Sequence, residues 1–410
     1  MSKKRIAMVI NSLSRGGAER TVSNLSRFLS GQYDIDLVVN DLQHLQYPFF
    51  GQIISLKMPP DRNVMGVGYQ IRALIKRTGV LRKLRKKFRY TAVISFSEMT
   101  NLANVLSRGA GGKTVISCHN SPRERLRDGW KYRLILKYLL PFCLQRADRT
   151  VSCSKEIADE LISEYALPVS RSAVIYNGVD NEKIRSMARD PLPDDTGFSA
   201  WAENQKLLVS VGRLTPQKGQ KHLIRAVKEL RENGLNVKLL ILGEGELRHE
   251  LEKLVCDLDM SGDVLLPGFS ENPFPFMARA DAFVSASLYE GFSNVLLEAL
   301  ACGVPCVSTD HVSGAREILS PETDYRQKTT AEAEKAAYGI LVPVCEKEAE
   351  GSEDPWTAEE LLLADAIREI LTDAELSTNY RAAALKRARE LDIASASGQW
   401  CRLIEETEEI

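Results

Sequence analysis

Short apolar runs alternate with longer amphipathic segments through the first 190 residues of the chain. The runs are rich in Val, Ile and Leu and are continuously apolar, which is typical of strands buried on both faces of a parallel sheet. The longer segments repeat their apolar positions at helical spacing. We predict strands at Arg5–Ile10, Ile35–Asn40, Ile53–Lys57, Ala92–Phe96, Thr114–Cys118, Thr150–Cys153 and Ala173–Tyr176. We predict helices at Ala18–Leu29, Tyr69–Phe88, Lys131–Gln145 and Lys155–Tyr165.

The alternation restarts after Asp190–Gly197, a segment rich in Pro, Gly and Asp and therefore typical of a linker. From Ala358 onward the pattern is helical, and Ser320–Ala337 is a polar segment between two apolar runs, which indicates an exposed insertion. We predict strands at Leu207–Val211, Val237–Leu242, Val264–Leu266, Asp281–Ser285 and Pro305–Thr309. We predict helices at Lys218–Asn233, Glu246–Leu258, Asn294–Ala301 and Ala394–Glu409.

Two successive units of this kind predict an α/β protein with two doubly wound parallel-sheet domains that face each other across a cleft. We place the boundary between residues 189 and 190, and the length of 410 residues suits two domains of roughly 200 residues each. Ligands of open α/β sheets bind at the carboxyl ends of the strands, so candidate chemistry is sought there.

Composition narrows the class of protein further. With 44% hydrophobic and 27% charged residues the chain is an ordinary globular protein, and no apolar stretch reaches the roughly 20 residues that a membrane-spanning helix needs. Its eight cysteines are scattered and complete no zinc-ligand spacing, which favours reduced thiols in a cytoplasmic protein. The net charge of −1 hides a basic first half and an acidic second half, so that one half is expected to meet an anionic partner.

The strongest motif runs from Glu290 through Glu298 to the sequence Ala-Cys-Gly-Val-Pro. A predicted strand leads into a small-residue turn, and a helix opens near Asn294. The first-turn N–H groups and the positive end of its dipole suit a phosphate. Two glutamates alone would be ordinary surface acids, but around such a helix start they suit sugar hydroxyls on either side of a diphosphate.

A second motif, Val-Gly-Arg-Leu-Thr-Pro-Gln-Lys-Gly, places Arg213 and Lys218 where another strand ends and a helix begins. Arginine can bind two phosphate oxygens with its planar fork, and lysine acts as a point charge. Two cations at a helix start conflict with the helix dipole, and this conflict favours an anionic ligand over a purely solvated surface.

Two weaker signals lie in the first half of the chain. Gly16 and Gly17 follow the first strand, where they either let a backbone approach a ligand or simply form a tight turn. His119 ends another strand and is either structural or a hydrogen-bonding or proton-handling group. The triplets Asp34/Asp36 and Asp257/Asp259 are interpreted as solvated boundary residues, and we expect no metal site. The remaining histidines, at positions 44, 222, 249 and 311, are interpreted as surface or packing residues.

With these residues the chain resembles glycosyltransferase family 4, whose members are retaining enzymes with the GT-B fold of two facing Rossmann-like domains. The resemblance covers nearly the whole chain and rests on the Gly-Gly-Ala-Glu-Arg loop, on Arg213 with Lys218, and on Glu290 with Glu298. It includes bacterial enzymes of cell-surface polysaccharide and lipid-linked oligosaccharide assembly. It implies that residues 394–410 cross back to the first domain, leaving residues 190–393 as the donor domain.

The resemblance also implies roles for the motif residues. Glu290 would contact donor-sugar hydroxyls, Glu298 the ribose, and His119 the transferred sugar. The diphosphate would be held by Arg213 and Lys218 and by the backbone of Ser293, Asn294 and Val295. The implied donor is a nucleotide diphosphate sugar, with UDP preferred, no metal cofactor is expected, and the product keeps the α configuration.

Basic segments suggest where the acceptor lies. Residues 72–87 carry eight cations interleaved with apolar positions, and residues 123–137 add a second basic cluster beside Trp130 and Tyr132. A basic amphipathic helix is typical of membrane-surface binding, although a solvated helix face remains an alternative. We expect a lipid-linked or glycan acceptor, peripheral binding to the inner face of the cell membrane, and no nucleic acid, because no nucleic-acid module accompanies the charge. Alternatives of the same fold are a sugar phosphorylase and a non-catalytic sugar-nucleotide-binding protein.

Overall fold

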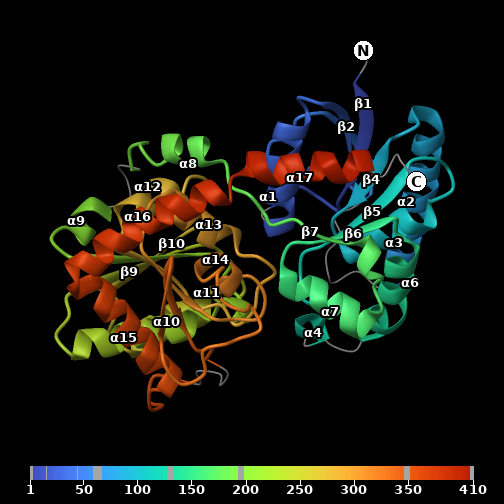
Figure 1. The fold of residues 1–410 in the computed structure, drawn as a ribbon. Coiled ribbons are helices and arrows are strands. Elements are labelled where there is room, and N and C mark those ends of the chain that lie inside the picture. Colours follow the sequence, from blue (N-terminus) through green and yellow to red (C-terminus); the bar gives the residue numbers. More distant parts are fainter. Residues whose placement is uncertain are drawn as a thin grey trace. The chain divides into compact units, whose positions relative to one another are not determined.

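A computed structural model describes residues 3–14, 16–43, 45–58, 67–126, 133–192, 198–345 and 351–406 of the chain. The chain divides into two compact units, Met1–Gly178 with Ile393–Ile410, and Val179–Asp392 (Figure 1). The division comes earlier than the predicted boundary at 189/190, because α8 (Asn181–Met187) packs against α12 (Phe274–Arg279) and α13 (Asn294–Ala301) of the second unit.

The first unit is built on a seven-stranded parallel sheet in the order β3-β2-β1-β4-β5-β6-β7. All seven predicted strands are confirmed, with ends that differ by one or two residues. They are β1 (Lys4–Val9), β2 (Tyr33–Val39), β3 (Gln52–Ser55), β4 (Ala92–Ser95), β5 (Lys113–Cys118), β6 (Arg149–Ser152) and β7 (Ser172–Val174). The helices and helical turns are α1 (Gly17–Leu29), α2 (Val67–Phe88), α3 (Glu98–Leu106), α4 (Pro122–Arg125), η2 (Ile135–Leu139), α6 (Leu140–Arg146), α7 (Lys155–Tyr165) and η3 (Val169–Arg171).

Helices cover both faces of this sheet, which explains why its strands are apolar throughout (Figure 1). Alternate residues of β1 enter two separate cores, Ile6 and Met8 on one face and Ala7 and Val9 on the other. The last helix, α17 (Ile393–Glu406), packs against α1 and joins the first of these cores. The predicted crossover of the final helix to the first domain is therefore confirmed.

The second unit repeats the plan with the strand order β10-β9-β8-β11-β12-β14-β13, in which only β13 runs antiparallel to its neighbour. The strands are β8 (Lys206–Val211), β9 (Val237–Leu242), β10 (Val264–Gly268), β11 (Ala282–Ser285), β12 (Cys306–Thr309), β13 (Glu334–Ala336) and β14 (Gly339–Val342). Its remaining helices are α9 (Phe198–Ala202), η5 (Pro216–Lys218), α10 (Gln220–Glu232), α11 (Arg248–Asp257), α14 (Ala315–Leu319), α15 (Ala358–Thr372) and α16 (Ala374–Glu390). The predicted doubly wound α/β class is confirmed.

The segment 320–337 is only in part the exposed insertion that its polarity predicted. It ends in the edge strand β13, and the carboxylate of Glu334 forms an ion pair with the buried guanidinium of Arg316 at 2.7 Å. The same guanidinium contacts Asp310 at 2.6 Å, and Asp310 also accepts a hydrogen bond from the backbone N–H of Thr329. A buried ion-pair network therefore fastens this polar segment to the sheet.

Asp36 was interpreted as a solvated boundary residue, and this interpretation is wrong. Its side chain is fully buried, forms an ion pair with Arg5 at 2.8 Å and accepts a hydrogen bond from the hydroxyl of Tyr90 at 2.5 Å. Residues two apart in a strand point to the same face, so the spacing of the Asp-x-Asp triplet does not reveal that Asp36, farther along β2 than Asp34, is covered by Arg5 and Tyr90. Asp34, two positions away, is exposed as expected.

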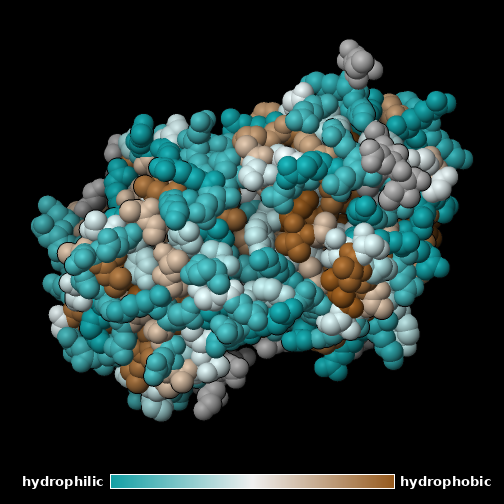
Figure 2. Space-filling model, viewed as in Figure 1, coloured by the Kyte–Doolittle hydropathy of each residue, from teal (hydrophilic) through white to brown (hydrophobic). Residues whose placement is uncertain are grey.

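The visible surface is mostly hydrophilic and carries separate hydrophobic patches (Figure 2). Within the described part of the chain, no helix is both long and apolar enough to cross a membrane.

Candidate functional site

Lys218 reaches the carboxyl end of β8 through a tightly shaped loop. After β8 the chain passes Arg213 and enters the 3₁₀ turn η5, which ends at Gly219. Gly219 has a φ of +60°, and a Cβ there would lie 2.1 Å from the carbonyl oxygen of Ala286. Only glycine meets both demands, so this residue fixes the loop that carries Lys218 close to the end of β11.

The ammonium of Lys218 forms an ion pair with the carboxylate of Glu290, and both side chains are largely buried. The hydroxyl of Ser287 donates a second hydrogen bond to Glu290 at 3.1 Å. Burial alone would raise the pKa of Glu290, but the charge of Lys218, a favourable electrostatic interaction with the nearby His311 and these hydrogen bonds hold it below its usual value. Glu290 is therefore ionised at neutral pH.

Gln217 connects the two loops and was not singled out from the sequence. Its carbonyl oxygen accepts a hydrogen bond from the backbone N–H of Leu288, and its side-chain amide donates one to the carbonyl of Tyr289, both at 2.8 Å. Because Gln217 immediately precedes Lys218 and Tyr289 immediately precedes Glu290, this pair of bonds sets the distance between the cation and the acid.

The helix α13 begins at Asn294, as predicted from the sequence. Its N-cap residue is Ser293, whose buried hydroxyl has no hydrogen-bond partner among the described residues. Asn294 and Val295 are half-buried, and Glu298 is buried, 2% exposed. The N–H groups of a first helical turn are not used by the helix itself, so the start of α13 can receive an anion.

Arg213 differs from Lys218 in its surroundings. Its side chain is exposed and forms no hydrogen bond or ion pair with the rest of the described chain, while its carbonyl oxygen accepts a hydrogen bond from Gln220 at 2.9 Å. The backbone is thus fixed and the guanidinium remains available. The structure brings together Lys218 and Glu290 directly, and it places Arg213 and the start of α13 at the carboxyl ends of β8 and β11.

The first unit carries the other predicted site residues. Gly16 is the N-cap residue of α1 and Gly17 its first helical residue, so the paired glycines lie at a helix start after β1. His119 follows β5, its Nε2 lies 2.9 Å from the hydroxyl of Ser117, and its ring stacks on Phe96. Burial lowers the pKa of His119 to about 4, so the imidazole is neutral at neutral pH. It can therefore accept or donate a hydrogen bond but is not a cationic acid there.

His311 was interpreted as a surface or packing residue, yet it lies beside this site. It follows β12, is fully buried and interacts electrostatically with Glu290. No motif signalled it, because a single histidine in a loop carries no periodicity and no spacing.

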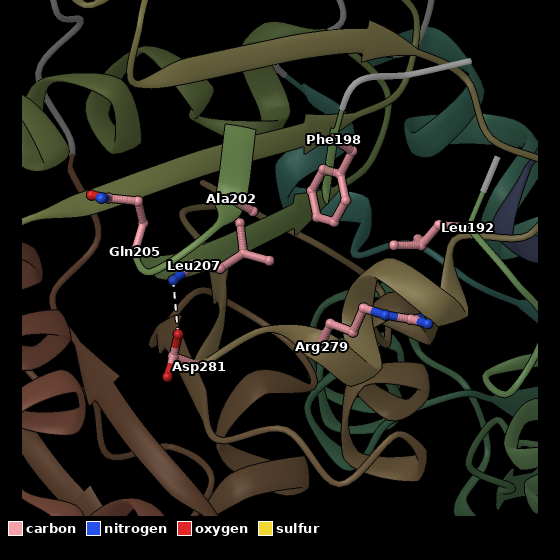
Figure 3. Close-up of a pocket in the computed structure, with 7 residues that line it drawn as sticks. All are labelled: Leu192, Phe198, Ala202, Gln205, Leu207, Arg279 and Asp281. Carbon is pink, nitrogen blue, oxygen red and sulfur yellow. Dashed lines mark hydrogen bonds between the residues drawn. The ribbon is translucent and has the colours of Figure 1, made fainter. Parts of the chain in front are cut away.

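No group of three or more residues of the metal-binding types His, Cys, Asp and Glu gathers within the described ranges. A cavity of about 270 Å³ lies at the opposite, amino ends of β8 and β11, where Asp281 accepts a hydrogen bond from the backbone of Leu207 (Figure 3). It is lined by Leu192, Phe198, Ala202, Gln205, Leu207, Arg279 and Asp281. None of the predicted site residues belongs to it.

The basic helix α2 separates into buried and exposed cations. Two of its eight predicted surface cations are structural: Arg77 donates to Asn11 and Asn40, and Arg85 is fully buried. That part of the membrane-surface prediction is wrong. Six cations of the helix are exposed. Five of them recur at intervals of three, four or seven residues and so share one side of the helix; they are Arg72, Lys76, Lys83, Lys86 and Lys87. The sixth, Arg82, donates a hydrogen bond to the carbonyl of Leu106 at 2.7 Å.

Exposed apolar side chains accompany these cations. Ile71 and Ile75 of α2 are 52% and 67% exposed. In the second basic segment, Leu134 and Tyr138 are exposed next to Arg133 and Lys137. Residues 127–132, which include Trp130 and Tyr132, lie outside the described residues. In the same segment Arg123 and Arg125 form ion pairs with Glu164 and Glu98.

The two Rossmann-like parallel sheets define the GT-B class of fold. The chain has a TM-score of 0.74 to the crystal structure of Anabaena HepE in complex with UDP and glucose, at 17% identity, covering 98% of this chain and 100% of that one. Residues 15–183 match the model of Glycosyltransferase Family 4, and residues 194–340 match that of Glycosyl transferases group 1.

Relatives in sequence agree with these matches. The chain is 30% identical over 396 residues to the N-acetylgalactosamine-N,N'-diacetylbacillosaminyl-diphospho-undecaprenol 4-alpha-N-acetylgalactosaminyltransferase of Campylobacter jejuni, covering 95% of this chain and 96% of that protein. It is 27% identical over 299 residues to the UDP-Gal:alpha-D-GlcNAc-diphosphoundecaprenol alpha-1,3-galactosyltransferase of Escherichia coli. That match covers 72% of this chain and 75% of the relative. The chain therefore belongs to the glycosyltransferases, with a first domain of the family 4 type and a second of the group 1 type.

Proposed function

We propose that this glycosyltransferase moves a hexose or N-acetylhexosamine from a UDP-sugar to a lipid-linked acceptor at the membrane surface, with retention of the α configuration. The observation that carries the proposal is the buried pair of Lys218 and Glu290 next to the start of α13. It combines a fixed cation, a fixed carboxylate and a helix N-terminus, which suits a sugar joined to a diphosphate.

Cleavage of the donor's glycosidic bond places negative charge on the leaving diphosphate. Lys218 and the first turn of α13 are positive groups fixed before the reaction begins, so they stabilise this charge without reorganising, and the exposed guanidinium of Arg213 adds a further positive charge near the end of β8. Preorganised electrostatics of this kind is often the largest single contribution to catalysis. Glu290 would accept hydrogen bonds from hydroxyls of the transferred sugar, and the buried Glu298 from the ribose.

We further propose that the reaction needs no resident metal ion, because Lys218 and Arg213 supply the positive charge that a metal would otherwise bring to the diphosphate. Turnover that survives treatment with EDTA supports this role. Loss of turnover in EDTA, restored by Mg²⁺ or Mn²⁺, contradicts it.

The acceptor is proposed from the relatives and from the surface of the first unit. Both relatives named above act, by their names, on sugars joined to a diphosphate-linked undecaprenol and form alpha linkages. The exposed cations of α2, together with Ile71 and Ile75, suit an anionic membrane into which two apolar side chains can insert. Each cation near such a surface contributes about 1 kcal/mol.

The membrane step can be tested without knowing the sugar. Reversing Lys76, Lys83 and Lys86 to glutamate should abolish co-sedimentation with vesicles that contain anionic lipid and leave the fold intact. Arg77 and Arg85 must be kept, because they are buried. Reversing the half-exposed Lys221 and the exposed Lys253 of the second unit to glutamate is the control. Unchanged vesicle binding by the first variant removes the membrane claim.

The transfer reaction is tested with a panel of UDP-sugars and a polyprenyl-diphosphate-linked sugar as acceptor, with the product detected by mass spectrometry. A thermal-shift screen of the same donors comes first, since a ligand that binds only the native state raises the melting temperature. A lipid product one sugar heavier supports the proposal. Release of a sugar phosphate with inorganic phosphate identifies a phosphorylase instead, and binding without turnover identifies a sensor.

A further inference from the structure

His311 lies in the loop between β12 and α14 with a side chain that is fully buried. Its Nδ1 is 3.1 Å from the carbonyl oxygen of Val312, so Nδ1 carries the hydrogen and donates it. Burial lowers the pKa of His311, which leaves the imidazole neutral. Nε2 is then a hydrogen-bond acceptor, and it has no partner among the described residues.

This missing partner is not a consequence of a loosely packed loop. Asp310 accepts hydrogen bonds from Arg316 and from the backbone of Thr329, and Lys328 donates to the carbonyl of His311 at 3.4 Å. The segment 320–337, whose role the sequence did not reveal, thereby holds Asp310 and the backbone of His311. A buried polar atom without a hydrogen-bond partner destabilises the folded protein, which calls for a ligand or another explanation.

The other side of the loop faces the candidate donor site. Ser313 donates a hydrogen bond to the carbonyl of Gly291, and Val312 forms a bridge with Tyr289, so the loop of His311 is joined directly to the loop of Glu290. The electrostatic interaction between His311 and Glu290 agrees with this arrangement. The carboxylate of Glu290 and the imidazole of His311 are thus held on two loops that are joined to each other.

We propose that Nε2 of His311 accepts a hydrogen bond from the transferred sugar, beside Glu290, and makes His311 a residue that selects the donor sugar. The proposal deepens the proposed function and rests on it. Two acceptors together require hydrogen-bond donors on the ligand, so the site selects sugars with a hydroxyl or an acetamido N–H at the matching position. A sugar that lacks this group leaves Nε2 buried without a partner, and sites of this kind discriminate strongly against such analogues.

The test compares UDP with UDP-sugars, because only the latter carry the group that His311 would contact. The full chain is titrated calorimetrically with UDP and with whichever of UDP-glucose, UDP-galactose and their N-acetyl forms the wild type uses. In His311→Leu the affinity for the UDP-sugar should fall about tenfold or more, while the affinity for UDP changes less than about twofold. His311→Gln keeps a neutral hydrogen-bond acceptor, so its affinity for the UDP-sugar should fall less than that of His311→Leu. This variant takes the place of His311→Leu if the leucine variant fails to fold.

Monodeoxyfluoro UDP-sugars identify the matching hydroxyl, since fluorine cannot donate a hydrogen bond. One analogue should bind the wild type about tenfold more weakly than the parent sugar and bind His311→Leu as well as the parent does. Parallel loss of UDP and UDP-sugar affinity, or no loss of either, overturns the assignment of His311. A wild type that binds none of these nucleotide sugars instead overturns the proposed function, so the two failures are distinguishable.

Discussion

The ammonium of Lys218 and the carboxylate of Glu290 meet across 72 positions of sequence, and each side chain is about one-seventh exposed or less. The attraction between the two charges offsets the cost of removing each of them from water. Removing one partner of a buried pair leaves an uncompensated charge, which destabilises the protein more than removing both. The pair therefore makes it possible to separate what these residues do for the fold from what they do for catalysis.

Lys218→Met and Glu290→Gln should each lower turnover about 10²–10³-fold, because each removes a preorganised charge from the site. The double variant should recover the stability lost by Lys218→Met but not the activity. Urea unfolding and steady-state kinetics on the same preparations measure both quantities. Lys221→Met, which breaks the exposed ion pair with Glu250, is the control and should change neither. A double variant that regains turnover contradicts a catalytic role for the pair.

Arg213→Ala should weaken UDP binding without weakening the fold. Its exposed guanidinium has no partner in the described part of the chain, so its removal breaks no contact. A hydrogen bond to a charged group contributes about 1.5–3 kcal/mol, so UDP should bind roughly tenfold to a hundredfold more weakly in calorimetry. Arg389→Ala, at an exposed position in the last turn of α16, controls for the loss of a surface cation. Equal UDP affinity in Arg213→Ala and the wild type would exclude a contact with the diphosphate.

The lowered pKa of the buried His119 should make the stability of the protein depend on pH. The pKa of His119 is about 4 in the folded protein, because of burial, and about 6.5 in an unfolded chain. Between these values the unfolded state binds more protons, so the free energy of unfolding should decrease as the pH falls from 6.5 towards 4. The contribution of His119 should be absent in His119→Asn. Urea unfolding at pH 7, 6 and 5 measures the slopes, and identical slopes in wild type and variant contradict the assignment.

The sequence predicted most of the strands and the long helices, because buried parallel strands leave continuous apolar runs and amphipathic helices repeat their apolar positions at helical spacing. It also located Lys218 and Glu290, since both follow apolar runs that could only be strands. It missed the apolar strand β14. It also did not predict β13, a polar edge strand of three residues, or α14, which is too short to show a helical period. Such elements form because neighbours such as the Arg316 network hold them.

Sequence patterns also did not reveal which charged side chains are buried. Counting cations along α2 predicts a basic surface, but the count does not say which side of the helix each one faces. Arg77 and Arg85 lie on the inner side and Arg72 and Lys76 on the outer side. His311 escaped detection for a related reason, because its importance comes from a loop that lies next to Glu290 only in the folded chain.

Arg85 and Lys86 are adjacent in α2 and should behave in opposite ways. Arg85 is fully buried and donates hydrogen bonds to Asn104, Ser107 and Thr114 and to the carbonyls of Gly111 and Gly112. Arg85→Met leaves these acceptors buried without a donor and should cost about 3 kcal/mol or more in urea unfolding.

Lys86 is exposed, so Lys86→Met should leave stability within about 0.5 kcal/mol and lower affinity for anionic vesicles roughly fivefold at low salt. Vesicle co-sedimentation should show this loss fading as ionic strength rises, because salt screens exposed charges. Equal losses of stability in the two variants would contradict the division of α2 into structural and surface cations. Salt-independent binding by Lys86→Met would instead assign the membrane contact to the apolar side chains of Ile71 and Ile75.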